Sequence, residues 1–207
     1  MNDIRDRIID AALTEAVFDG WTQGTLERAA ERIGLTPFDA KRAFPGGVLE
    51  ALNYHSRRGD TRMLESLTTD YNLPTMKIRE RIATAVMVRL RQNTAHREAI
   101  RRALAVYAMP WNSVAGMKNL YATVDAMWHA AGDTSTDYNF YTKRMLLSKV
   151  YTTTLYVWLD DPSPNLENTE AFLRRRIENV MQIEKFKAKA KESFGKLEEW
   201  LPKKFRA

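Results

Sequence analysis

Residues that could do chemistry concentrate between Asp125 and Arg144, where aromatic and polar side chains alternate. Helical spacing places Asp125 and Trp128 near one face of a predicted helix that ends in this stretch. Phe140 and Tyr141 begin the next helix and point about 100° apart, so we expect at least one of them to be exposed. Aromatic residues and arginine gathered at a helix–turn–helix corner are typical of a protein-binding hot spot. The alternative is that these aromatic side chains fill a core.

The usual signatures of an enzyme are absent from the sequence. His55, His96 and His129 lie on separate predicted helices and have no second metal ligand at helical spacing. The chain has no cysteine, which excludes disulfides, thiolate metal sites and cysteine nucleophiles. It has no Gly-x-Gly-x-x-Gly, Walker or nucleophile-elbow motif. We therefore predict no catalytic residue, no metal and no cofactor. A hydrolase with a hydrophobic pocket stays an alternative, because a Ser/His/Asp arrangement would leave no local pattern.

The elements that would position these residues are all helices. Apolar residues recur at helical spacing along the chain, and no segment alternates as a strand does. A length of 207 residues with 44% hydrophobic and 28% charged residues is typical of one globular domain. The predicted helices are Ile4–Phe18, Thr25–Ile33, Pro37–Phe44, Val48–Leu67, Pro74–Gln92, His96–Tyr107, Val114–Ala131, Tyr138–Leu159 and Leu166–Ile183, followed by a C-terminal amphipathic helix.

Proline, glycine and capping residues predict where some of these helices begin and end. Pro74 suits the first position of a helix, and Gly59 is a weak point within one. Gly132 is a plausible left-handed cap that ends the helix before the corner. Thr134–Asp137 has the pattern of a capping box that opens the helix from Tyr138.

The run Met145–Leu159 is apolar around most of its circumference, so it is either buried on all sides or lines a cavity. Residues 84–88 and 103–107 offer smaller side chains for the facing walls, and nine methionines could make such a pocket adaptable. We predict a cavity for a hydrophobic ligand, and a tightly filled core is the alternative. The predicted lining is Val86, Leu104, Tyr107, Leu147, Val150, Tyr151, Thr154, Leu155 and Trp158.

Positive charge accumulates at the C-terminus. Residues 1–60 hold 8 Lys+Arg and 10 Asp+Glu, whereas residues 184–207 hold 8 and 4. A basic helix with one apolar stripe can lie on an anionic membrane, and no uncharged run reaches the roughly 20 residues that span one. The alternatives are that this helix folds onto its own body or pairs with a second helix, as in a homodimer. The predicted membrane-binding residues are Ile183, Phe186, Lys187, Lys191, Phe194, Leu197, Trp200 and Leu201.

The N-terminal segment resembles the helix-turn-helix head of TetR-type regulators. The resemblance rests on Gly20–Thr25, Leu26–Gly34 and Leu35–Phe38, followed by Phe44-Pro45. It implies a TetR-like helical bundle, and it makes a ligand-responsive, DNA-binding transcription regulator the alternative function. Against DNA binding, this region is net negative, whereas phosphate neutralisation supplies most of the binding energy for nucleic acid. The chain also has Gly46-Gly47 where TetR proteins usually place a lysine.

The segment from Asp125 to Arg144 resembles the Coq-nine family, lipid-binding accessory proteins of coenzyme Q (ubiquinone) biosynthesis. The resemblance continues in Tyr151–Thr154, Asp161–Pro164 and Phe172–Ile177. It implies a TetR-like fold, a bound lipid of the isoprene or quinone type, and a surface for the di-iron hydroxylase that acts on demethoxyubiquinone. Family members often have tryptophan where this chain has Phe140, so an aromatic anchor remains without the indole donor. The implied docking residues are Asp125, Met127, Phe140, Tyr141 and Arg144.

Three segments are predicted: a helix-turn-helix-like segment (1–46), a helical ligand-binding body (47–182) and a basic amphipathic helix (183–207). With the resemblance, they indicate a non-catalytic protein that binds a lipid or quinone intermediate at a membrane and presents it to the hydroxylase. The N-terminus is too charged for a secretory signal and too acidic for a mitochondrial transit peptide. We expect a cytoplasmic protein, peripheral on the inner face of the bacterial inner membrane, or the equivalent at the mitochondrial matrix face.

Overall fold

The computed structural model describes residues 2–134 and 138–182, and within these ranges every regular element is a helix. Three 3-10 turns, η1 (Leu73–Thr75), η2 (Thr94–His96) and η3 (Pro164–Leu166), join the longer elements. The prediction of an all-α fold is confirmed. The α-helices are α1 (Asn2–Asp19), α2 (Gln23–Arg32), α3 (Pro37–Ala43), α4 (Gly47–Thr69), α5 (Ile78–Arg91), α6 (Arg97–Ala108), α7 (Ser113–Ala130), α8 (Tyr138–Leu159) and a helix over residues 167–182.

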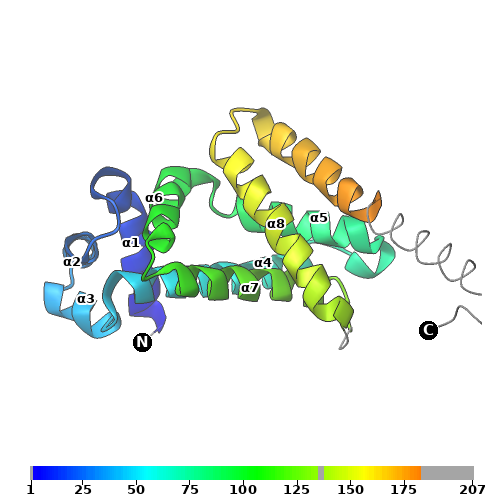
Figure 1. Ribbon diagram of the computed structural model, residues 1–207. Helices are drawn as coiled ribbons and strands as arrows, with labels where there is room; N and C mark the ends of the chain where they lie inside the picture. Colours follow the sequence, from blue (N-terminus) through cyan, green and yellow to red (C-terminus); the bar gives the residue numbers. More distant parts are fainter. Residues whose placement is uncertain (1, 135–137, 183–207) are drawn as a thin grey trace, which may run out of the picture.

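Helices α1, α2 and α3 form a compact head at one end of the molecule (Figure 1). The Thr22 side chain accepts a hydrogen bond from the backbone N–H of Thr25 and begins α2. Thr36 and Asp39 form a capping box that begins α3. Gly34 has a φ of 81°, which allows the tight turn between the two helices. Their apolar faces share a core with α1, α6 and the first turns of α4.

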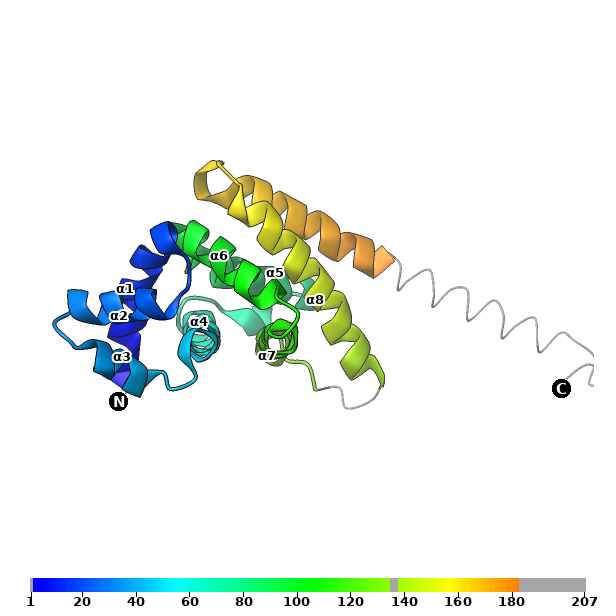
Figure 2. The same ribbon diagram turned by 60° about the vertical axis from the view of Figure 1, so that its left-hand side comes forward.

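A second core holds the body together between α4, α5, α7 and α8. Helix 167–182 lies beside α8 in both views of the ribbon (Figures 1 and 2). Its start is fixed by Asp161, whose carboxylate accepts hydrogen bonds from the backbone N–H groups of Ser163 and Thr169. Burial alone would raise the pKa of Asp161, but hydrogen bonds from the side-chain hydroxyls and the backbone N–H groups of Ser163 and Thr169 outweigh burial and lower the pKa below its usual range.

Most predicted helix boundaries fall within two residues of the observed ones, and the helix Tyr138–Leu159 is confirmed at both ends. The prediction that Pro74 opens a helix is wrong. Pro74 lies in η1, and α5 begins only at Ile78 because the Glu80 carboxylate accepts a hydrogen bond from the backbone N–H of Lys77. Gly132 has a φ of 88°, as predicted for a left-handed cap.

Two predictions fall on parts of the chain outside the described residues. The capping box at 134–137 includes residues 135–137, and the predicted membrane-binding helix covers 183–207. Among the described helices, none is long and apolar enough to cross a membrane.

Candidate functional site

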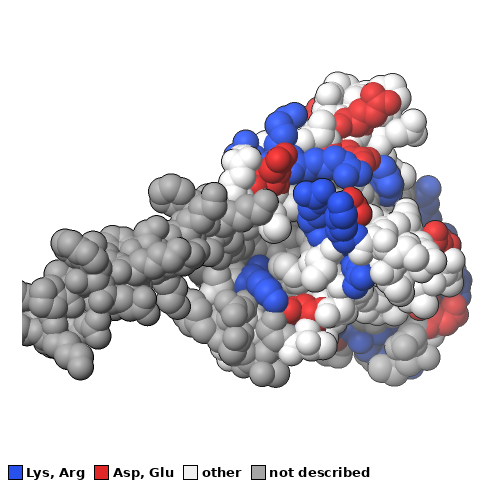
Figure 3. Space-filling model, turned by 90° about the vertical axis from the view of Figure 1, so that its right-hand side faces the viewer, with Lys and Arg blue, Asp and Glu red and all other residues white. Residues whose placement is uncertain are grey.

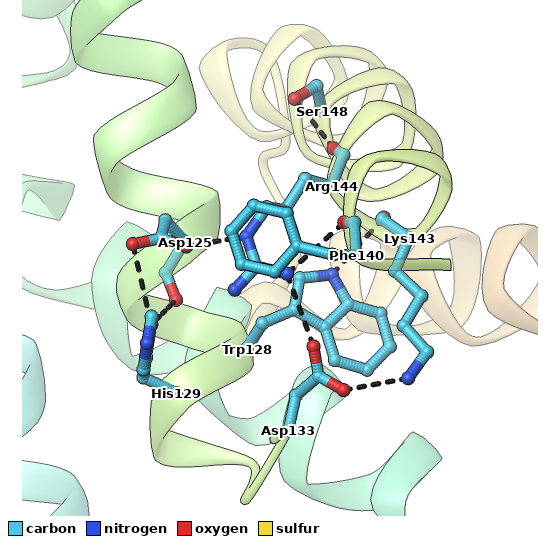
Figure 4. Close-up of polar contacts among 8 residues, drawn as sticks. All are labelled: Asp125, Trp128, His129, Asp133, Phe140, Lys143, Arg144 and Ser148. Carbon is cyan, nitrogen blue, oxygen red and sulfur yellow. Dashed lines mark hydrogen bonds and ion pairs between the residues drawn. The ribbon is translucent and has the colours of Figure 1, made fainter. Parts of the chain in front are cut away.

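The predicted docking corner is built around one buried arginine. Arg144, on the second turn of α8, is only 1% exposed. Its guanidinium donates to Asp125 on α7 (Nε–Oδ1, 2.5 Å) and pairs with Asp133 (Nη1–Oδ2, 3.2 Å), as Figure 4 shows. A buried charge is tolerated when such partners compensate its lost hydration. The ion pairs therefore tie the start of α8 to the end of α7.

Aromatic rings cover this ion-pair cluster. The centre of the Phe140 ring lies 3.3 Å from the guanidinium carbon of Arg144 (Figure 4). The Tyr141 ring meets the Phe140 ring edge-on, with 5.1 Å between the ring centres. The indole N–H of Trp128 donates to the carbonyl of Lys143 (3.2 Å), and the Lys143 ammonium lies 5.6 Å from the indole. These contacts make a platform at the corner, from which the Tyr141 ring projects, 65% exposed.

Only part of the predicted docking patch reaches the surface. Tyr141 is exposed, and Asp125 and Phe140 are partly exposed. Met127 and Arg144 correct the prediction, because their side chains lie inside the molecule at 0% and 1% exposure. Met127 packs in the core of the body, and Arg144 faces the two carboxylates instead of solvent.

A cavity of about 770 Å³, which we call the corner cavity, opens beside this platform. The volume lies within the range of ligand pockets, roughly 300–1,000 Å³. The cavity shares Trp128 and Lys143 with the corner, and Ile177 and Val180 of helix 167–182 form its far wall. On the face shown in Figure 3, many of the lysine and arginine side chains lie close together, with acidic side chains among them. The other lining residues are Lys77, Ile78, Arg79, Ile82, Gly132, Asp133, Thr134, Thr142, Leu146, Leu147, Val150 and Met181.

A second and smaller cavity, the inner cavity, holds about 200 Å³ among α4, α5, α6, α7 and α8. Its wall contains Arg89, which forms a buried ion pair behind the wall by donating from Nε to Asp60 Oδ1 at 2.9 Å. Thr123 donates its hydroxyl to the same carboxylate. Gly59 lies under the Arg89 guanidinium, and a Cβ at this position would stand 2.6 Å from Arg89 Cζ. The predicted weak point of α4 is therefore the place where its backbone makes room for a buried cation.

Of the nine residues predicted to line one cavity, seven are divided between two cavities and two line neither. Leu104, Tyr107, Tyr151, Leu155 and Trp158 line the inner cavity, and Leu147 and Val150 line the corner cavity. Val86 and Thr154 line neither cavity, and both side chains are fully buried. Sequence reasoning missed His55 and Arg89 on the inner cavity and Trp128, Ile177 and Val180 on the corner cavity. Only the glycine within α4 gave a signal that another group approaches its backbone.

The helix-turn-helix head offers little free positive charge where a reading helix would meet DNA. On α3, Arg42 pairs with Asp39 (3.1 Å) and Lys41 pairs with Glu27 of α2 (3.2 Å). Phosphate contacts would have to compete with these carboxylates. Over residues 2–134 and 138–182 there is also no group of three or more His, Asp or Glu side chains that could hold a metal ion.

Comparison with known proteins matches both the sequence pattern and the fold. Residues 114–184 match the family model COQ9, the Coq-nine family described above. The chain is 33% identical to "Ubiquinone biosynthesis protein COQ9, mitochondrial" of Homo sapiens over 186 residues, covering 87% of this chain and 58% of the human protein. It is 27% identical to the Drosophila melanogaster protein of the same name, covering 56% of that protein. The chain therefore spans less than two thirds of the length of these relatives.

Among solved structures, the TetR transcriptional regulator from Nitrosomonas europaea ATCC 19718 superposes with a TM-score of 0.69 at 20% identity. The match covers 87% of this chain and 99% of the regulator. At this identity the likeness concerns the fold, and it confirms the predicted TetR-like architecture.

Proposed function

Because the chain is a relative of the COQ9 proteins of ubiquinone biosynthesis, we propose that it serves the same process without catalysing a step itself. It binds a lipid or quinone intermediate, docks on a membrane and presents the bound molecule to the di-iron demethoxyubiquinone hydroxylase. The corner cavity carries this proposal, since it combines a ligand-sized, mainly apolar interior with walls shared by the docking corner.

The lining of the corner cavity suits an amphiphilic ligand. Ile82, Leu147, Ile177 and other aliphatic side chains would hold an isoprenoid or acyl chain away from water. Lys77 and Arg79, which also line the cavity, would attract polar or anionic groups of the ligand. A ligand held there lies against Trp128 of the docking corner, and the exposed Tyr141 ring of the same corner faces the partner. Binding and presentation thus use one corner of the molecule.

Filling the corner cavity tests the lipid-binding part of the proposal. Ile177→Trp adds an indole to its far wall, so the purified variant should retain less lipid after organic extraction and mass spectrometry. Leu104→Trp places the same side chain in the inner cavity and serves as the matched control. Equal lipid content in wild type, Ile177→Trp and Leu104→Trp would reject the corner cavity as the lipid site.

The membrane step is proposed from the sequence of residues 183–207, where a stripe of apolar residues accompanies basic ones. Each lysine near an anionic surface adds about 1 kcal/mol to binding. Deleting residues 184–207 should abolish flotation with anionic vesicles, and undiminished flotation would reject this role. A gel shift with random duplex at physiological salt separates the proposal from transcription regulation, because a carrier should leave the duplex unshifted.

A further inference from the structure

The inner cavity contains buried polar atoms without partners, which is unusual for a folded protein. Both ring nitrogens of His55 and the indole nitrogen of Trp158 lack a hydrogen-bond partner among the described residues. Both side chains line this cavity, and they are 9% and 0% exposed. Each buried polar group left unsatisfied costs about 1–3 kcal/mol. Three such atoms around one hollow indicate that a hydrogen-bonding molecule completes the site.

The charges around the cavity are already balanced within the protein. Arg89 donates to Asp60 and to the backbone carbonyl of Ser56, while Asp60 also accepts from Thr123. Burial lowers the pKa of His55 to about 3, and repulsion by Arg89 adds to this effect, so the imidazole is neutral at physiological pH. A charged ligand would therefore lose its hydration without gaining an ion pair.

The size and walls of the inner cavity define which molecules would fit it. A cavity of about 150 Å³ can hold a benzene ring, and this cavity has about 200 Å³. Tyr107, Tyr151 and Trp158 offer aromatic faces, and Leu104 and Leu155 offer aliphatic ones. A neutral imidazole supplies one donor and one acceptor, and the indole supplies one donor. The complementary ligand is a single ring that carries a hydroxyl or carbonyl oxygen.

We propose that the inner cavity is a second binding site, separate from the corner cavity, for an uncharged single-ring phenol or quinone. His55 is the specificity-determining residue, because its imidazole exchanges hydrogen bonds with the ring oxygen. Trp158 donates to the same or a second oxygen. The site does not depend on a lipid chain in the corner cavity.

The probe that tests this site is p-cresol, the analogue of a tyrosine side chain, which stays uncharged at neutral pH. Binding to the full chain is measured by isothermal titration calorimetry beside two comparators, toluene without the hydroxyl and 4-methylbenzoate with a negative charge. We expect p-cresol to bind at least about tenfold more tightly than either, the value of one buried hydrogen bond. Toluene binding as tightly as p-cresol would overturn the proposal, as would no p-cresol binding up to about 10 mM, the result for a cavity that holds only water.

Variants place the binding in the inner cavity. His55→Gln keeps one donor and one acceptor without charge, so its affinity for p-cresol should stay within about threefold of the wild type. His55→Leu has no hydrogen-bonding group and should lose about tenfold. Equal affinity of the Leu and Gln variants would contradict the role of the imidazole. If His55→Leu fails to fold, the comparison of p-cresol with toluene on wild type still decides.

Two filling variants separate this proposal from the lipid site. Leu104→Trp should abolish p-cresol binding and retain lipid, and Ile177→Trp should retain p-cresol binding and lose lipid. Loss of p-cresol binding in Ile177→Trp alone would place the ring in the corner cavity and reject the second site. Failure of lipid retention in wild type would reject the proposed function and leave the p-cresol result standing.

Discussion

Acidification should destabilise the wild-type protein more than a His55→Gln variant, because the folded state keeps His55 neutral. Burial lowers the pKa of His55 to about 3, with further repulsion from Arg89 and Arg58. In the unfolded chain the imidazole regains its ordinary pKa of about 6.5. Below pH 6.5 the unfolded state therefore binds a proton that the folded state refuses. The free energy of unfolding falls as the pH drops from about 6.5 toward 3, and it is unaffected above this window.

The size of this effect follows from the two pKa values. At pH 5.0 an imidazole with a pKa of 6.5 is almost fully protonated, which stabilises the unfolded chain by about 2 kcal/mol relative to pH 7.5. The folded state gains almost nothing over the same range. Glutamine does not titrate, so His55→Gln should lack this loss of about 2 kcal/mol.

Urea denaturation followed by far-UV circular dichroism at pH 7.5 and 5.0 measures the effect. The comparison is a double difference, so the contributions of His96, His129 and the carboxylates cancel, and so does the effect of the substitution at neutral pH. A pH dependence that is equal in both proteins within about 0.5 kcal/mol would refute the reasoning. It would mean that the imidazole takes up a proton inside the fold.

Three further substitutions give separate tests by the same denaturation assay. Gly59→Ala should cost about 3 kcal/mol, because the added Cβ would stand 2.6 Å from Arg89 Cζ and displace the guanidinium from Asp60; an unchanged midpoint would show that the ion pair moves freely. Arg144→Met should also cost about 3 kcal/mol, since it leaves two carboxylates of the corner without their shared cation, and a neutral result would contradict a structural role. Tyr141→Ala should change stability by less than about 0.5 kcal/mol, because the ring is 65% exposed; it should weaken binding to the hydroxylase about tenfold in a pull-down titration, and undiminished binding would remove it from the docking surface.

Local signals in the sequence predicted most of the fold. Helical periodicity gave the all-α class, and Gly132 marked the end of α7 because its φ of 88° favours glycine. The prediction that α5 begins at Pro74 was wrong because this segment contains two signals for a helix start, the proline and Glu80. The carboxylate of Glu80 caps the backbone at Lys77, and this capping bond decides where α5 begins. Glutamate at the third helical position was a readable signal for the later start.

The site was harder to predict because it depends on contacts between residues distant in sequence. Arginine is seldom buried, and Arg144 is buried because Asp125 and Asp133 meet its guanidinium once α8 folds back against α7, which the spacing of these residues alone does not show. The sequence indicated which residues of α8 line a cavity, but it did not indicate which side of the helix each of them faces. A helix that is apolar nearly all round gives no period from which a facing side can be read.

Helix α8 separates the two cavities and contributes side chains to both. Val150 faces the corner cavity, and Tyr151, its neighbour in the chain, faces the inner one. Truncating either side chain would enlarge the cavity that it lines and leave the volume of the other cavity nearly unchanged. Inserting a single residue upstream of Val150 would instead rotate every later side chain of α8 by about 100° about the helix axis. Both cavities would then lose the side chains that α8 contributes to their walls. The chain can thus vary its two cavities independently by substitution, whereas a change in the length of this helix alters both at once.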